Sequence, residues 1–180
     1  YRNSGPRMLE HVNAPVKAMI GPWDHDFPHN AWHLPQVEWR HEAVRWFDQF
    51  MKGVNTGLLD EPALAVYVRD YHPPDATMTE FPGRWRYEDE WPVKRTDYQE
   101  WLAQPDKRLS RQRADETSHH MTYKASLGLE GGGPTMWWGS IPPDQQPMDD
   151  HSLVYDSDPL VEPLEVLGRP IAKLRVSADA

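Results

Sequence analysis

The chain has no cysteine among its 180 residues, and this excludes several kinds of chemistry. Without cysteine there is no disulfide framework, no thiolate nucleophile and no cysteine-ligated zinc site. The compartment stays open, because both cytosolic and secreted proteins can lack cysteine. The first residues also lack the apolar core of a signal peptide, and the chain does not begin with methionine. We therefore expect a processed or partial chain.

Long apolar runs and clusters of basic residues are also missing. No apolar run approaches the roughly 18 residues of a membrane-spanning helix, so no membrane partner is expected. The formal net charge is −9, and no basic run exceeds two residues. Proteins that bind a nucleic-acid backbone display clustered Lys and Arg, so nucleic acid is excluded as a partner. The hydrophobic content of 38% is too high for a disordered chain.

The first half of the chain predicts a strand–loop–helix–strand order. Residues 16–20 form a near-continuous apolar run, which is typical of a strand covered on both faces. Residues 21–36 contain three prolines and predict an irregular loop. Residues 37–51 predict a helix, and residues 63–69 a second apolar strand. The helix rests on apolar residues at three- and four-residue steps: Ala43, Val44, Phe47, Phe50 and Met51.

Beyond Pro92 the helical periodicity fades, and short apolar runs alternate with turn residues. These runs predict strands at 98–102, 153–155, 164–166 and 171–176. The sequence thus predicts an α/β part over residues 1–92 followed by an all-β part over residues 93–180. Neither part has enough strands to close a core alone.

His25 is the strongest candidate for catalysis. It lies in the loop that follows the first predicted strand, and open α/β sheets place reactive groups at the carboxyl ends of strands. Histidine can shuttle a proton near neutral pH, because its reference pKa is about 6.5. A histidine in a polar loop also commonly serves as an ordinary surface residue, so the residues alone leave both readings open.

Two alternative sites compete with catalysis by His25. His25, His29 and His33 are spaced by four, beside Asp24 and Asp26, and imidazole with carboxylate suits zinc. Pro28 falls within the run, however, so a helix that would align these side chains is not expected. The nine tryptophans suggest a second alternative, a face that stacks against carbohydrate, although burial is the commoner fate of tryptophan.

A serine nucleophile has no candidate in this chain. It should occupy a Gly-x-Ser-x-Gly turn between a strand and a helix. Ser4, Ser126 and Ser140 lie beside glycine or near it, but none has that pattern.

Several motifs together resemble the cocaine esterase/Xaa-Pro dipeptidyl-peptidase group of hydrolases (CocE/NonD). The resemblance covers essentially the whole chain with gaps. Its motifs are Gly21–His25, Ala43–Gly53, Trp85-Arg86 with Trp91-Pro92, Asp144–Pro147, Leu153–Leu160 and Leu164–Gly168.

The resemblance implies an α/β-hydrolase domain with a Ser-Asp-His triad, followed by a galactose-binding-like jelly roll. Residues 1–92 would be the end of the first domain, and residues 93–180 the beginning of the second. Members of the group cleave ester, amide or Xaa-Pro dipeptide bonds through an acyl-enzyme, with no cofactor and no metal. His25 matches the triad histidine, whereas Asp24 and Asp26 match no triad position. The nucleophile and the aspartate would lie upstream, in a protein that the proportions of the group make about three times as long.

The resemblance also leaves questions open. Asp26 is charged where the group often has a small residue, and residues 103–135 match poorly. We expect this chain alone to be inactive, since it lacks the serine and the aspartate. A carbohydrate-binding or structural β-sandwich without catalysis is the alternative, and association between copies of the chain stays open.

Overall fold

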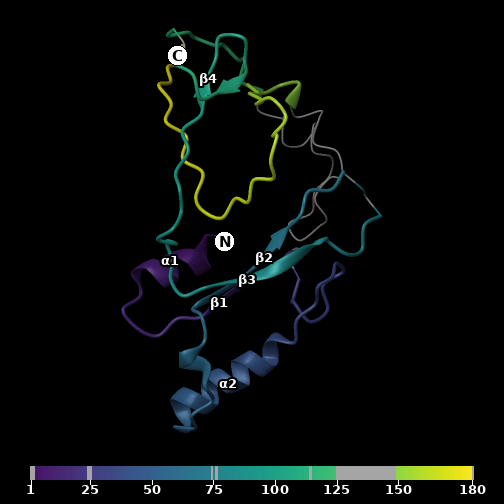
Figure 1. Ribbon diagram of the computed structural model, residues 1–180, viewed down its shortest axis with the longest axis vertical. Coiled ribbons are helices and arrows are strands. Elements are labelled where there is room, and N and C mark those ends of the chain that lie inside the picture. The colour runs from purple at the N-terminus through teal and green to yellow at the C-terminus, as the bar shows by residue number, and fades with distance from the viewer. Residues whose placement is uncertain are drawn as a thin grey trace.

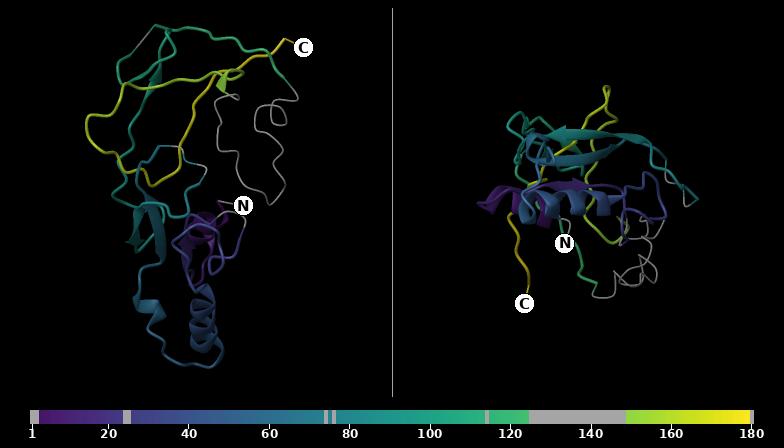
Figure 2. Two further views of the ribbon diagram at one scale, coloured as in Figure 1. Left: turned by 90° about the vertical axis from the view of Figure 1, so that its right-hand side faces the viewer. Right: turned by 90° about the horizontal axis from the view of Figure 1, so that it is seen from below.

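The computed structural model describes residues 3–23, 26–73, 75, 77–113, 115–124 and 149–179. These residues form small sheets with few helices, arranged on two levels along the long axis of the molecule (Figure 1). The lower level holds a three-stranded sheet with its helices, and the chain beyond the sheet rises to a second level. Figure 2 shows the same two levels from the side.

The elements follow one another in a helix–strand–helix order before the chain turns to strands. Their bounds are α1 Ser4–His11, β1 Ala18–Ile20, α2 Trp39–Met51, the 3₁₀ turn η1 Leu58–Asp60, β2 Leu64–Arg69, β3 Gly83–Glu88, β4 Leu102–Ala103 and β5 Leu109–Ser110.

The larger sheet has the order β1-β2-β3. β1 pairs with β2 in parallel, and β2 pairs with β3 antiparallel, from Leu64 opposite Glu88 to Arg69 opposite Gly83. The strands predicted at 16–20 and 63–69 are confirmed as β1 and β2. β2 alternates in burial, with Leu64 and Val66 buried, and these two side chains belong to a small core. The other buried apolar residues that the structure describes are Pro6, Ala31, Leu58 and Val93.

The helix predicted at 37–51 is confirmed as α2, but its predicted apolar face is not buried. Val44, Phe47, Phe50 and Met51 are exposed, and no residue of α2 is fully buried. The helix instead directs Trp39, Ala43 and Trp46 toward a cavity beside the sheet. The periodicity therefore identified the helix correctly, and the described residues put no element against its apolar stripe.

The upper level contains a small sheet of β4 and β5, paired antiparallel. Residues 153–156 run beside it, with Leu109 N–H donating to the Asp156 carbonyl at 2.7 Å. The strands predicted at 153–155, 164–166 and 171–176 do not form, and of 98–102 only Leu102 lies in a strand. A strand needs a hydrogen-bonded neighbour, and the described residues provide none along 153–155, 164–166 and 171–176.

In the described part of the chain, no helix is both long enough and apolar enough to span a membrane.

Candidate functional site

The loop after β1 contains the predicted catalytic histidine. β1 ends at Ile20, and residues 21–36 lead from the carboxyl end of this strand to α2. His25 and its neighbour Asp24 lie outside the described residues. The structure describes the loop on both sides of them, from Gly21 to Trp23 and again from Asp26 onward.

Trp23 anchors the loop before His25. Its indole Nε1 donates a hydrogen bond to the Pro35 carbonyl at 2.7 Å, and its ring centroid lies 6.1 Å from that of Trp85 in β3. The indole also covers Gly21, where an added Cβ would lie 2.5 Å from a ring carbon. A side chain at position 21 would therefore displace Trp23, which explains glycine there.

Phe27 and His29 anchor the loop after His25. Both contact Trp39 at the beginning of α2, and the Phe27 and Trp39 rings stack at 5.8 Å with an interplanar angle of 11°. Trp39 Nε1 donates a hydrogen bond to His29 Nδ1 at 3.0 Å. The first turn of α2 thus holds this end of the loop.

The far end of the loop is bound to the segment before β3. Leu34 N–H donates to the Thr79 carbonyl at 2.8 Å, and Phe81 N–H donates to the Leu34 carbonyl at 3.2 Å. His33 packs against Phe81, with ring centroids 4.7 Å apart. Asp26 is exposed.

The histidine cluster considered as a zinc site is not assembled among the described residues. No group of three histidine or acidic side chains suited to a metal occurs there. His29 already uses Nδ1 in its bond with Trp39, and His33 packs on Phe81. The third member, His25, lies outside the described residues.

A cavity of about 580 Å³ lies between α2 and the sheet. Its walls are mainly apolar and aromatic, and Trp39, which holds the histidine loop, forms part of them. The other lining residues that matter here are Met19 of β1, Trp46 of α2 and Tyr87 of β3. Trp39 therefore lines the cavity and also holds the histidine loop.

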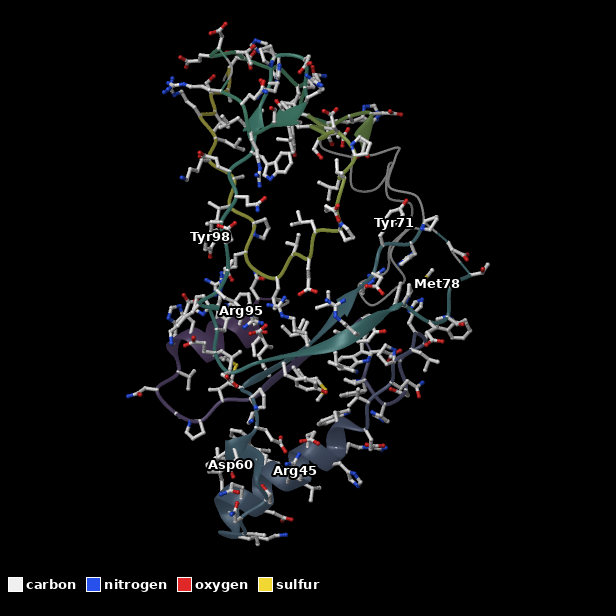
Figure 3. The ribbon with its side chains drawn as sticks, in the orientation of Figure 1. Arg45, Asp60, Tyr71, Met78, Arg95 and Tyr98 are labelled. Atoms are coloured by element: carbon white, nitrogen blue, oxygen red, sulfur yellow. The ribbon has the colours of Figure 1, made fainter. Side chains whose placement is uncertain are left out.

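One end of this cavity carries charge that is paired within the protein. Arg45 donates to Glu42 at 2.8 Å and pairs with Glu61, beside η1 (Figure 3). Lys17 hydrogen bonds the carbonyl of Pro62 at 2.9 Å. Burial lowers the pKa of Lys17 below its ordinary 10.5, and Glu61 opposes this shift. Because these cations already have partners, the cavity is suited to apolar groups more than to a free anion.

The tryptophans do not form an exposed stacking face in the described part of the chain. Trp23, Trp39 and Trp85 are in ring contacts, and among the described tryptophans only Trp32 is exposed. Trp137 and Trp138 lie outside the described residues. Carbohydrate binding stays an alternative that no described contact favours.

The bond between Trp39 and His29 was not predicted from sequence. An indole N–H needs an acceptor, but the loop offers several histidines, and their spacing does not identify the partner. The pairing of Arg45 with Glu61 was missed for a similar reason, since the two residues come together only when η1 folds back beside α2.

The chain is similar to one protein family and to two curated proteins. A model of the X-Pro dipeptidyl-peptidase C-terminal non-catalytic domain matches residues 40–180. Two curated proteins are 27% identical over 196 residues: "Putative serine esterase Mb1866c" of Mycobacterium bovis (strain ATCC BAA-935 / AF2122/97) and "Putative serine esterase MT1883" of Mycobacterium tuberculosis (strain CDC 1551 / Oshkosh). The alignments cover 100% of this chain and 29% of each relative, so the chain spans less than a third of their length. No solved structure matches the chain.

Proposed function

The chain belongs to the family of X-Pro dipeptidyl-peptidase C-terminal non-catalytic domains, and from this we infer that it is part of a serine hydrolase. The whole hydrolase cleaves ester, amide or Xaa-Pro dipeptide bonds of a small-molecule or peptide substrate. Residues 1–92 contribute the end of its α/β-hydrolase domain, and residues 93–180 begin a galactose-binding-like jelly roll. The esterase names of the two relatives support the hydrolase class.

The observation that carries this proposal is the location of the histidine loop. The match to the non-catalytic domain begins at residue 40, so His25 precedes it. The loop leaves the carboxyl end of β1, the edge where open α/β sheets place reactive groups. It is anchored on both sides of His25: Trp23 contacts Trp85 of β3, and Phe27 stacks on Trp39 of α2. Anchors of this kind hold a catalytic loop in one geometry.

His25 acts as the proton carrier of the reaction. It takes the proton of a serine hydroxyl as that oxygen attacks the acyl carbon, and it then protonates the leaving group. The serine and the orienting aspartate come from other parts of the longer protein. His29 is unsuited to this role, because its Nδ1 already accepts the hydrogen bond from Trp39.

The exposed stripe of α2 also supports a larger hydrolase domain. Val44, Phe47 and Met51 lie on the surface of the helix without a described partner element. An exposed apolar stripe of this kind marks a surface that contacts further polypeptide. Further segments of the longer protein would cover it.

The proposal is tested by replacing His25 in the longer protein. We expect His25→Ala to lower kcat by about 10⁴-fold or more, as loss of a triad histidine does, on a p-nitrophenyl ester or an aminoacyl-proline p-nitroanilide. The matched control is His41→Ala, an exposed histidine of α2, which should leave kcat unchanged. Circular dichroism confirms that both variants fold. A folded His25→Ala protein with the kcat of the unmodified enzyme would refute the assignment.

A labelling experiment tests the location of the nucleophile. A fluorophosphonate probe reacts with an activated serine, and the longer protein should be labelled at one serine. The isolated 180-residue chain should stay unlabelled, because the proposal places the nucleophile elsewhere. Covalent labelling of any serine between residues 1 and 180 would contradict it.

A further inference from the structure

The two faces of β3 have different chemistry. Because side chains of a strand alternate, Arg84, Arg86 and Glu88 share one face, and Trp85 and Tyr87 share the other. Tyr87 lines the cavity beside α2. Residues 164–170, which we call the C-terminal segment, reach the charged face of β3 through Glu165.

Glu165 binds this charged face. Its carboxylate accepts hydrogen bonds from both Arg84 and Arg86, about eighty positions earlier in the chain. Arg86 also donates to Glu88 at 2.5 Å, and Arg95 donates to Glu88 at 2.5 and 2.7 Å. Figure 1 shows the last part of the chain, yellow-green to yellow, as a loop that descends from the level of β4 toward the sheet and then returns to the level of β4. Arg95 lies where the chain leaves β3 for the upper level (Figure 3).

Arg169 makes a second attachment four residues later. Its guanidinium donates to the carboxylate of Glu10 in α1 and lies 5.9 Å from the centre of the Trp91 ring. The attachments have opposite polarity: an acidic side chain of the segment meets basic residues of β3, and a basic side chain meets an acidic residue of α1. A slide of the segment by four residues would therefore bring Glu165 to Glu10, or Arg169 to Arg84 and Arg86, and like charges would meet.

Apolar packing contributes little to this attachment. Between the two charged residues Val166 is 75% exposed and Leu167 is half-buried, and Ile171 and Leu174 beyond them are exposed. The segment and residues 95–101 enclose a cavity of about 520 Å³. The C-terminal segment therefore borders a cavity, and it is attached to the lower level through the ionic contacts of Glu165 and Arg169.

We propose that Glu165 with Arg84 and Arg86, together with Arg169 and Glu10, form an ionic clasp that fixes the C-terminal segment against β3 and α1. The clasp sets the position of the upper level relative to the sheet. Because its contacts are ionic and partly exposed, concentrated salt loosens it. This inference does not depend on the proposed hydrolase activity.

The test measures a distance across the clasp. The experiment uses the longer protein, with any cysteine outside these 180 residues replaced by serine. Met51→Cys in α2 and Leu174→Cys then supply the two sites for nitroxide labels, because the 180 residues contain no cysteine and both positions are exposed. Electron paramagnetic resonance of the doubly labelled protein should give one narrow distance peak. Adding Glu165→Gln should abolish that peak, and 1 M NaCl should broaden it. The matched control Glu162→Gln, an exposed carboxylate outside the clasp, should keep it.

A charge swap makes the test specific. Arg169→Glu alone places two carboxylates together and should broaden the distance distribution. Arg169→Glu combined with Glu10→Arg restores the pair in reverse and should recover the narrow peak. Circular dichroism shows whether each variant keeps its secondary structure. The clasp is refuted if Glu165→Gln gives the same narrow peak as Glu162→Gln, or if the double swap does not narrow the distribution again.

Discussion

Trp39 and His29 are joined by a hydrogen bond of 3.0 Å from the indole Nε1 to the imidazole Nδ1. An indole nitrogen can only donate, so His29 Nδ1 carries no proton, and the neutral ring is protonated at Nε2. This bond connects the loop that contains His25 to the first residue of α2. The position of the loop is therefore coupled to the beginning of the helix.

Removing this donor should loosen the loop. Trp39→Phe keeps an aromatic ring beside Phe27 but deletes the N–H, at a cost of about 1 kcal/mol for one hydrogen bond. We expect faster amide exchange at Asn30, whose N–H donates to the Phe27 carbonyl, and loss of the fixed His29 tautomer in nitrogen NMR. Trp32→Phe, at an exposed position, is the control. Equal exchange rates in the two variants would show that the bond does not hold the loop.

Glu88 should be important for stability. Its side chain is 3% exposed and accepts hydrogen bonds from Arg86 and Arg95. Glu88→Gln removes the counter-charge of Arg95 and one of the two carboxylates that bind Arg86, which keeps Glu165. Because both arginines are partly exposed, we expect a loss of about 2 kcal/mol in the free energy of unfolding. Urea denaturation measures this loss. Glu90→Gln, which breaks only the exposed pair with Lys94, should cost less than about 1 kcal/mol. Equal urea midpoints for the Glu88→Gln and Glu90→Gln variants would contradict a stabilising role of Glu88.

The same carboxylate predicts a pH dependence. Burial raises the pKa of Glu88, but hydrogen bonds from Arg95 and Arg86 outweigh burial and lower the pKa below its ordinary 4.5. A group with a lowered pKa in the folded state stabilises the protein fully above its unfolded pKa, and this contribution disappears as pH falls through the folded pKa. Stability should therefore fall on acidification below pH 4.5, and less steeply in Glu88→Gln. Parallel pH profiles of the two proteins would exclude Glu88 as a source of the slope.

Gly83 should not tolerate a side chain. An added Cβ would lie 2.3 Å from the Val68 carbonyl oxygen and 3.0 Å from the Arg69 Cα, both backbone atoms that cannot rotate away. We expect Gly83→Ala to cost about 2 kcal/mol and to lower the melting temperature, since the strand pair must separate. In the control Gly5→Ala the new Cβ lies 3.7 Å from Ala18 Cβ, and alanine favours the helix. A Gly83→Ala protein as stable as the Gly5→Ala protein would contradict the close contact.

Sequence reasoning located elements whose pattern is local. The apolar steps of 37–51 and the apolar runs at 16–20 and 63–69 identify α2, β1 and β2. β3 was missed, although its charged and aromatic residues alternate as they do in a strand with two different faces. Burial of the α2 stripe and pairing of 171–176 depend on neighbouring elements, which the pattern of one segment does not contain.

The candidate site was predictable only in part. The position of the loop after an apolar strand directed attention to His25, but the catalytic role of this residue stays a prediction, since it lies outside the described residues. The division of the chain near Pro92 also stays a prediction. The bond from Trp39 to His29 depends on a choice among acceptors that the three-dimensional fold makes.

The sheet joins two strand pairs of very different sequence separation. β2 reaches its antiparallel neighbour β3 across residues 70–82, whereas β1 reaches β2 only across residues 21–63, which include the whole histidine loop and α2. Loop-closure entropy rises with the length of chain enclosed, so the hairpin has the smaller barrier to assembly. We therefore expect the hairpin to form first and β1 to be added to it. On this order, we expect the loop that follows β1 to take its final place late, after β3 and its tryptophan are already in position.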